Sequence, residues 1–209
     1  MISRWMAYLQ YQWGAQLDAA GRADAYSSWS AQLQGSERWW MLLEGTHVLT
    51  LMLFAGTILF VDLRLLGLAL PKVSISRVSR SLLPYTVVGF VLMVVTGLLV
   101  YFSKPFDYYH NFAFRAKLVF LVLAAVNIFI FHGRVQSNQA QWDADPVPPL
   151  AARRSAAASI VLWILVIATG RAMAYDRFTC AEAGPVIGVL ADCEGRQATL
   201  DAIAQEVSL

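Results

Sequence analysis

A run of apolar residues from Thr46 to Val61 constrains this chain more than any other feature. No side chain in the run carries a formal charge, apart from His47 when it is protonated. A helix that crosses the hydrocarbon core of a bilayer, roughly 30 Å thick, needs roughly 20 mostly apolar residues. With its flanks, the run is long enough. The sequence therefore predicts a transmembrane helix that ends at Asp62 and Arg64.

The composition places the rest of the chain in the bilayer as well. Of its 209 residues, 58% are hydrophobic and 14% are charged, and the mean hydropathy is +0.53. Charged residues make up about 25% of an ordinary soluble domain. The net charge of +2 is small and dispersed, whereas a nucleic-acid interface needs a clustered basic face. We therefore expect lipid and other membrane protein subunits as partners, and no nucleic acid.

Hydropathy and turn residues divide the chain into three parts. We predict an amphipathic interfacial segment over 1–40, a membrane bundle over 41–175 and a polar tail over 176–209. The bundle is expected to be all-α and antiparallel, because short connectors make sequence neighbours pack together. Proline, serine and other polar residues predict a non-helical connector at 71–80 and an extended connector at 133–154. Because the second span is expected to start at 82, Pro84 should lie in its first turn. The four predicted spans are about 41–66, 82–102, 112–132 and 156–175.

Basic residues predict the orientation of these spans. Positively charged short loops stay on the cytoplasmic side of a membrane. The connectors after the first and third predicted spans are both basic, so both termini are expected on the opposite side. The hairpin before the third span weakens this bias without reversing it, because it carries Lys104, Arg115 and Lys117. The basic residues of the two connectors are Arg64, Lys72, Arg77, Arg80, Arg134, Arg153 and Arg154.

The only two cysteines, Cys180 and Cys193, lie in the tail that this orientation places outside. Compartments outside the cytoplasm, such as the bacterial periplasm, are oxidising, and the turn formers Gly184-Pro185 and Gly188 lie between the two thiols. We therefore predict a disulfide, which should stabilise the folded tail by about 3 kcal/mol in the chain-entropy model. The alternative is a pair of separately buried thiols.

Five short motifs lie between Glu44 and Tyr175, at positions 44–47, 62–67, 111–117, 127–132 and 170–171. Together they resemble an uncharacterised family of four-helix bacterial inner-membrane proteins, a domain of unknown function. The resemblance implies a multi-pass protein of the bacterial inner membrane, and in such a membrane the basic connectors predict that both termini are periplasmic. The layout of that family is similar to small membrane-bound b-type cytochromes and to the membrane component of copper-resistance systems, which implies electron transfer by analogy alone. The motifs are Glu44-Gly-Thr-His47, Asp62-Leu-Arg-Leu-Leu-Gly67, Asn111-Phe-Ala-Phe-Arg115-Ala-Lys117, Asn127-Ile-Phe-Ile-Phe-His132 and Gly170-Arg171.

His47 is the strongest candidate for a functional side chain, since ionisable residues inside a bilayer are costly and face a partner or a cavity. On a helical wheel Glu44 and Asp62 each lie about 60° from it, so the three share one stripe. His47 could donate a hydrogen bond to a neighbouring helix, act as a haem or metal ligand, or relay protons.

Depth limits which groups could join His47 in one site. A helix rises about 1.5 Å per residue, which puts His47 some 25 Å from Arg64 and close to the outer surface. His132 closes the third span at the inner face, so it cannot clamp one haem iron together with His47. It is interpreted as an interfacial snorkelling group or, as the alternative, a separate ligand in the inner leaflet. His110 is the expected partner of His47, with Met173 as a thioether alternative. A solvated hairpin position is the other reading of His110.

Three basic residues near the outer ends of the spans could form a cationic rim. Such a rim would pair with haem propionates, with a quinone carbonyl or with Glu44, although plain snorkelling is equally compatible with the pattern. Asn127 is expected to hydrogen-bond between helices, and Asp62 to pair with Arg64. The three basic residues are Arg115, Lys117 and Arg171.

Two hypotheses of function follow. One is an electron-transfer subunit that binds haem b or a quinone near the periplasmic face. The other is a structural or accessory subunit without a cofactor, in which the same polar groups only join helices. No nucleophile with an adjacent base, no phosphate-binding loop and no zinc motif occurs in the sequence, so nothing favours hydrolysis or nucleotide chemistry.

Overall fold

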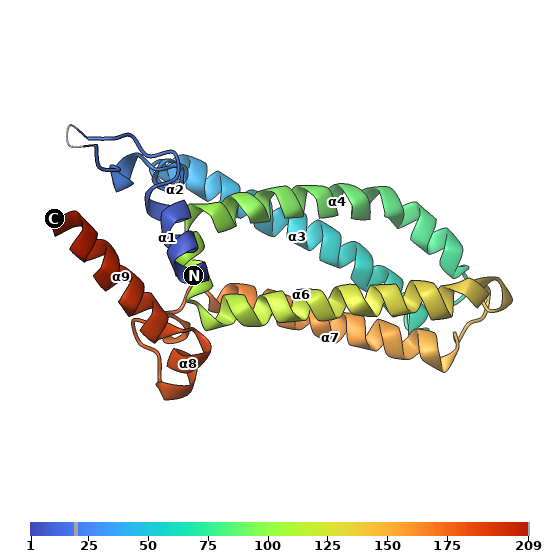
Figure 1. Ribbon diagram of the computed structural model, residues 1–209. Coiled ribbons are helices and arrows are strands. Elements are labelled where there is room, and N and C mark those ends of the chain that lie inside the picture. The colour runs from blue at the N-terminus through green and yellow to red at the C-terminus, as the bar shows by residue number, and fades with distance from the viewer. Residues whose placement is uncertain (19–20, 209) are drawn as a thin grey trace. The chain divides into compact units, whose positions relative to one another are not determined.

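The computed structural model describes residues 1–18 and 21–208, and it is all-α: within these ranges it has no strand, only an isolated bridge between Leu17 and Ala23 (Figure 1). The α-helices are α1 (Ile2–Tyr11), α2 (Trp29–Gln34), α3 (Glu37–Leu65), α4 (Ile75–Ser103), α5 (Pro105–Tyr109), α6 (Phe112–Ile130), α7 (Leu150–Ala172), α8 (Pro185–Leu190) and α9 (Cys193–Ser208). The shorter elements are 3-10 helices at Ala25–Ser27, Gln136–Gln141 and Asp176–Phe178 and a π-helical turn at Phe131–Val135.

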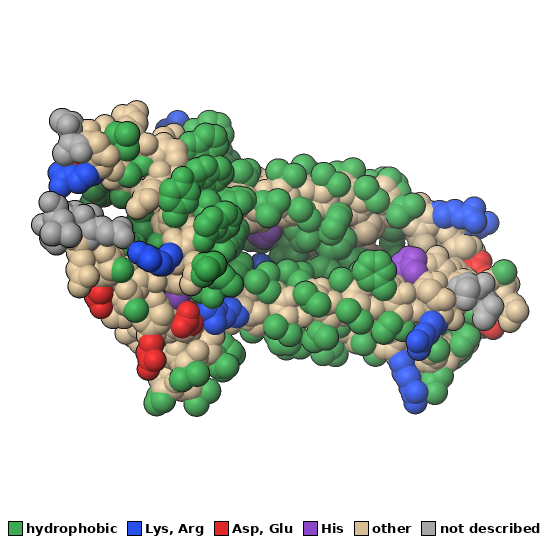
Figure 2. Space-filling view, viewed as in Figure 1, with side chains coloured by type: hydrophobic (Ala, Val, Ile, Leu, Met, Phe, Trp, Pro, Cys, Tyr) green, Lys and Arg blue, Asp and Glu red, His purple; other side chains and the backbone are tan. Residues whose placement is uncertain are grey.

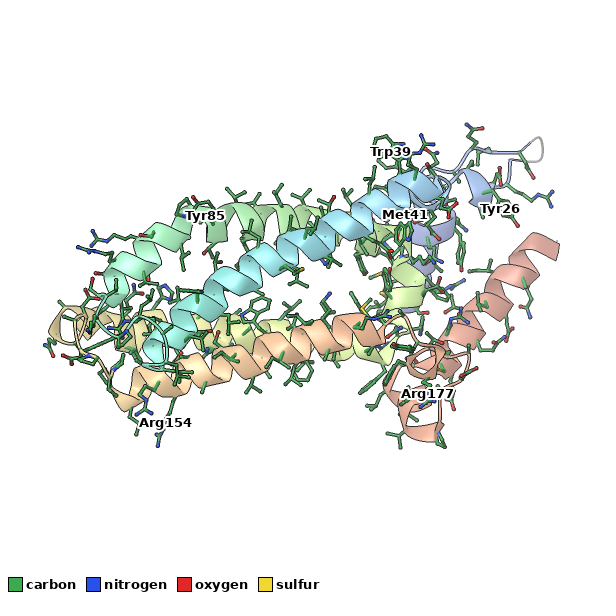
Figure 3. The ribbon with its side chains drawn as sticks, turned by 180° about the vertical axis from the view of Figure 1, so that it is seen from behind. Tyr26, Trp39, Met41, Tyr85, Arg154 and Arg177 are labelled. Atoms are coloured by element: carbon green, nitrogen blue, oxygen red, sulfur yellow. A yellow bond between two sulfur atoms is a disulfide. The ribbon has the colours of Figure 1, made fainter. Side chains whose placement is uncertain are left out.

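Four of these helices are long and apolar enough to cross a membrane, namely α3, α4, α6 with its π-helical extension to Val135, and α7. They confirm the prediction of an all-α membrane protein with four spans. Large apolar side chains lie exposed along them, as lipid-facing side chains should. Trp39, Met41 and Tyr85 are examples, at 71%, 62% and 59% exposure, and Figure 3 shows them pointing away from their helices.

The start of α4 differs from the sequence prediction. The helix begins at Ile75, inside the stretch 71–80 that we expected to be non-helical, so Pro84 lies in the helix interior and not in its first turn. Its first turn is capped from far along the chain. The Ile75 N–H donates to the carbonyl of Asp143 (3.1 Å), and the Asp143 carboxylate accepts from the Ser76 N–H (2.7 Å) and hydroxyl (2.6 Å). The residues around Ile75 do not indicate that the distant Asp143 caps this helix.

The connector between α6 and α7 is also more ordered than predicted. The stretch expected to be extended begins with the π-helical turn and a 3-10 helix, and α7 already starts at Leu150. Trp142 explains the difference, because it is only 7% exposed and packs in a cluster with Leu65, Ile75, Ala152 and Ala156. A bulky aromatic that docks in a core holds the backbone around it close to the bundle.

The chain separates into two compact units. We call Met1–Thr46, Val95–Ala116 and Thr169–Leu209 the terminal unit, because it holds both chain ends. We call His47–Val94 and Lys117–Ala168 the central unit. The terminal unit therefore combines three stretches that are far apart in the sequence.

The central unit is built on close helix contacts. Phe54 of α3 is 6% exposed, and its ring lies 5.1 Å from Trp163 of α7 and 5.4 Å from Phe90 of α4. At Gly89 the backbones of α4 and α3 approach so closely that an added Cβ would lie 3.1 Å from the Phe54 nitrogen. Small residues allow such approaches in membranes. Figure 2 shows a hollow between α4 and α6 with hydrophobic side chains on its rim.

Side-chain hydrogen bonds also join helices of the central unit. Thr86 of α4 donates to Thr57 of α3 at 2.9 Å. Asn127 of α6 donates to the Ser155 carbonyl of α7, and the Ser155 hydroxyl donates back to the Asn127 side chain, both at 3.0 Å. The expected interhelical role of Asn127 is therefore confirmed.

The terminal unit packs α1 against α5, α2 and α9. Helix α1 ends at Tyr11, and the chain turns soon after it at Gly14 (φ +71°). The ring of Trp29 fills the space that a side chain at this glycine would need.

The cysteines of the tail form a disulfide. The two sulfur atoms of Cys180 and Cys193 are 2.06 Å apart, and the two Cα atoms 5.4 Å. These distances lie in the usual range for disulfides. The predicted bridge between Cys180 and Cys193 is therefore confirmed.

Candidate functional site

His47 lies in α3, is half-buried, and hydrogen-bonds to the backbone of Met93 in α4. Lys117 of α6 is close enough for its charge to act on the imidazole. All three residues belong to the central unit. The structure thus contains the interhelical hydrogen bond that was one of the alternatives for His47, and it brings Lys117 of the predicted rim within electrostatic range of the ring.

The hydrogen bond to Met93 also has a chemical consequence. A ring N–H that donates to a backbone carbonyl determines the tautomer, so the opposite nitrogen of the imidazole is an acceptor. Histidines that bind metals are commonly held by a hydrogen bond of this kind. His47 is therefore compatible with a ligand role as well as with a purely structural one.

His110 is a buried link between helices of the terminal unit. It follows α5, is 1% exposed, and uses both ring nitrogens: Nε2 lies 2.9 Å from the Ser3 hydroxyl and Nδ1 lies 3.1 Å from the Ala191 carbonyl. Burial lowers the pKa of this imidazole below its ordinary value of 6.5, so its neutral form is favoured. The solvated reading of His110 was wrong, and a ligand role would cost one of the two bonds.

Arg115 binds the same end of α8 as His110. Its Nη1 donates to the Leu190 carbonyl (2.9 Å), next to the Ala191 carbonyl that His110 contacts, and its Nε donates to the Tyr109 carbonyl (2.8 Å). The guanidinium also lies over the Tyr109 ring, 4.6 Å from its centroid. Backbone carbonyls that end a helix attract cations. Arg115 is thus largely engaged in holding α8.

The other predicted site residues of the terminal unit have separate surroundings. The backbone carbonyl of half-buried Met173 accepts from the Asn111 side chain at 3.3 Å. Arg171 is exposed and lies over the Tyr175 ring, 5.3 Å from its centroid. Glu44 is exposed on α3, and its charge adds to burial in raising the pKa of Tyr108 to about 12.

His132 is exposed, and within the described part of the chain its hydrogen bond is local. Its Nδ1 lies 2.9 Å from the Ile128 carbonyl one turn earlier in the same helix. Across residues 1–18 and 21–208, no group of three or more His, Cys, Asp or Glu side chains gathers as a metal site would require. Metal binding by His47, His110 or His132 stays a prediction.

The predicted ion pair between Asp62 and Arg64 is not formed. Arg64 is fully buried and donates from Nε to the Val73 carbonyl (2.7 Å) and from Nη2 to the Asp145 carbonyl (3.0 Å). Asp62 interacts with Ser159 of α7 instead. Residues two apart on a helix point to different faces, which explains why the pair does not close.

One polar residue of the terminal unit was missed by the sequence analysis. Gln10 of α1 is 7% exposed, and its Oε1 accepts from the N–H groups of Phe106 (2.9 Å) and Asp107 (3.3 Å). Its Nε2 donates to the Asp107 carboxylate at 3.0 Å, and Arg196 reaches the same carboxylate at 3.3 Å. A glutamine in an amphipathic helix is expected on the solvent-facing side, so the sequence did not indicate that Gln10 is buried.

The four membrane-length helices and the polar groups that join them define an all-α, multi-pass membrane protein. The family model described as a family of unknown function, DUF6644, matches residues 40–176. The match covers more than half of the chain, which therefore belongs to this family. No curated protein and no solved structure matches the chain. The expected membership in an uncharacterised family is confirmed, and the likeness to b-type cytochromes stays a prediction.

Proposed function

We propose that this protein is an electron-transfer subunit that binds a redox group in the membrane through His47 and Lys117. The observation that supports it is an oriented imidazole within the membrane-spanning part of the central unit, with an ammonium group close enough for its charge to act on the ring. Ionisable groups at such depth are costly and mark functional sites. Of the two redox groups that the sequence suggests, the contacts favour a quinone over haem b.

The two side chains offer complementary chemistry to a quinone. Lys117 supplies only donors, which suit the carbonyl oxygens of the oxidised form. His47, with one nitrogen donating to Met93, presents an acceptor, which suits the hydroxyl of the reduced form. A bound quinone would supply the electron and proton chemistry itself, and the chain would bind and orient it.

Haem b fits the contacts less well. Haem iron is held by axial ligands such as His or Met, and the expected second ligand, His110, uses both ring nitrogens within the terminal unit. Arg115, predicted to face propionates, holds the Tyr109 and Leu190 carbonyls. Binding haem through these groups would cost several hydrogen bonds.

The lipid-facing surface supports access from the bilayer. On the α4 and α6 segments of the central unit, apolar side chains such as Val88 (53% exposed) and Val122 (63%) are open to lipid. Figure 2 shows a hollow between the same two helices. Apolar pockets with a few convergent polar groups are the usual form of a cofactor site.

A second function, an accessory subunit without a cofactor, is favoured by a different observation. The hydrogen bonds of His47 and Asn127 join one helix to another, and that of His110 joins the residues that follow α5 and α8. Such bonds stabilise a bundle whether or not a ligand is present.

We also propose that the protein lies in a bacterial inner membrane with both termini in the periplasm. The disulfide supports this placement, because disulfides persist in oxidising compartments. The basic connectors support it too, because such loops remain cytoplasmic.

The experiment that tests the proposed function is cofactor analysis of the protein purified in a mild detergent. We expect extractable quinone in the wild type and its loss in His47→Ala. His132→Ala is the matched control and should keep the quinone, because His132 is exposed and its hydrogen bond is local. A reduced-minus-oxidised spectrum of the same samples tests for haem. A haem band that is lost in His47→Ala would show that the bound group is haem b and not a quinone. Colourless, quinone-free protein would overturn the proposal and leave the accessory subunit.

A further inference from the structure

Asp62 is a buried carboxyl group at the end of α3 within the central unit. The residue is 6% exposed, and among the described residues the polar group that acts on it is Ser159 of α7. Its Oδ2 is inaccessible to solvent and has no hydrogen-bond partner in the described part of the chain. Buried polar atoms in native proteins nearly always have a partner, so this oxygen calls for an explanation.

No counter-ion accounts for it. Arg64, two residues away, is directed to the Val73 and Asp145 carbonyls, and no ion pair to Asp62 occurs within the described ranges. The Asp143 carboxylate is engaged with Ser76 and Gln139. The remaining charged or titratable groups on the neighbouring elements are exposed: Lys72, Arg77, Arg80, His132, Arg134, Asp145, Arg153 and Arg154.

An ionised carboxylate in these surroundings would be a lone charge in an apolar medium. The cost is so high that such groups become neutral instead. Protonation removes that charge, and a neutral hydroxyl at Oδ2 costs far less to bury without a partner than an ionised oxygen does. We propose that Asp62 is a proton-binding site, which holds one proton as a neutral acid against Ser159 and exchanges it without any change in oxidation state.

Polar groups on the neighbouring helices extend from this site. Ser155 lies one turn before Ser159 on α7 and exchanges two hydrogen bonds with Asn127 of α6. On α3 itself, Thr57 is hydrogen-bonded to Thr86 of α4. Among the acids of the central unit that the structure describes, Asp62 is the one that lies within a membrane-length helix and interacts with a polar side chain of another helix, Ser159.

The test uses dicyclohexylcarbodiimide, an apolar reagent that modifies protonated carboxyl groups within membranes. The acid proton passes to a carbodiimide nitrogen, the carboxylate oxygen bonds to the central carbon, and rearrangement leaves a stable N-acylurea. We expect one adduct on the peptide that contains Asp62 in the full-length wild type. The adduct should decrease as the pH is raised and should be absent in Asp62→Asn. The matched control, Asp145→Asn, removes an exposed acid and should keep the adduct.

Three results would overturn the proposal. One is an unmodified Asp62 peptide in folded protein at acidic pH, and another is equal modification of Asp62 and exposed Asp145. The third is protection of Asp62 by Na⁺ alone, which would show a metal cation in place of the proton. Mapping the adduct on the wild type needs no variant, so the test holds even when Asp62→Asn fails to fold. The outcome is independent of the quinone analysis, which concerns His47.

Discussion

Among single residues, the buried cationic and imidazole side chains use backbone carbonyls as partners. Arg64 binds the carbonyls of Val73 and Asp145, and His110 and Arg115 bind those that end α8. A carbonyl partner satisfies a donor without bringing a second charge into an apolar region, which avoids the desolvation of an ion pair. Such partners lie far away in the chain, so residue type alone does not reveal them.

Arg64→Lys should destabilise the protein although it keeps the positive charge. Lysine cannot reproduce the two divergent donors that Arg64 uses. We expect a loss of about 1–3 kcal/mol, the usual cost of leaving a buried polar group unsatisfied. Thermal unfolding in detergent measures it, with the exposed Arg154→Lys as control (Figure 3). Equal midpoints for the two variants would contradict this role of Arg64.

Acidification should weaken the terminal unit through His110. Its pKa is lowered by burial, so the unfolded chain takes up the proton first as the pH falls. Stability from this residue is complete above the ordinary value of about 6.5 and is lost as the pH falls toward the lower folded value. Unfolding midpoints between about pH 7 and pH 5 should therefore fall more steeply for the wild type than for His110→Gln. His132→Gln, the exposed control, should keep the wild-type slope.

At the scale of elements, close backbone approaches and one covalent link hold the helices. The crossing of α3 and α4 at Gly89 depends on the absence of a side chain, since the Phe54 backbone lies 3.1 Å from the position that the Cβ of an alanine would take there. Gly56, also in a membrane-spanning helix, has open space around its Cβ position. Close packing therefore requires a glycine at position 89, whereas the packing around Gly56 leaves room for a side chain.

Gly89→Ala should destabilise the bundle by about 1–3 kcal/mol, because overpacking forces the two helices apart. Gly56→Ala, the matched control, should be neutral or stabilising by up to about 1 kcal/mol, because alanine favours a helix. Unfolding in mixed micelles compares the two. A similar effect of both substitutions would show that the approach at Gly89 does not limit packing.

Loss of the bridge should destabilise the tail that carries α8 and α9. The cysteines are 13 residues apart, and closing a loop of this size contributes about 3 kcal/mol in the chain-entropy model. Cys180→Ser should therefore expose the tail to limited proteolysis much as the double variant Cys180→Ser/Cys193→Ser does. Wild-type protein under reducing conditions should match them, and unchanged proteolysis on reduction would contradict the expectation.

Considered as a whole, the chain brings its two ends together. The hydroxyls of Ser3 in α1 and Thr199 in α9 lie 2.8 Å apart, and Figure 1 shows both ends in the terminal unit. An even number of spans has the same consequence, since it returns the chain to the side on which it began. Both termini therefore belong on one side of the membrane.

A labelling experiment can identify that side. In the Cys180→Ser/Cys193→Ser background, Tyr26→Cys should react with a membrane-impermeant maleimide once the outer membrane is permeable. Arg154→Cys should react only after the inner membrane is disrupted. Both positions are exposed and labelled in Figure 3. The reverse pattern would invert the proposed orientation.

The sequence by itself determined the four spans, the all-α class, the disulfide and the interhelical role of Asn127. These features depend on local composition. The thickness of the bilayer sets the length of apolar sequence that a spanning helix needs, and the two cysteines, which lie in one short segment, can form an intramolecular disulfide only with each other. The family of unknown function was likewise recognisable from short motifs.

Tertiary structure alone decided the start of α4, the burial of His110, the separation of Asp62 from Arg64 and the role of Gln10. In each case the partner lies on another element: Asp143 caps α4, Ala191 binds His110, Ser159 contacts Asp62 and Asp107 binds Gln10. A local pattern records whether a side chain is polar, but its hydrogen-bond partner is determined only when helices distant in sequence pack together.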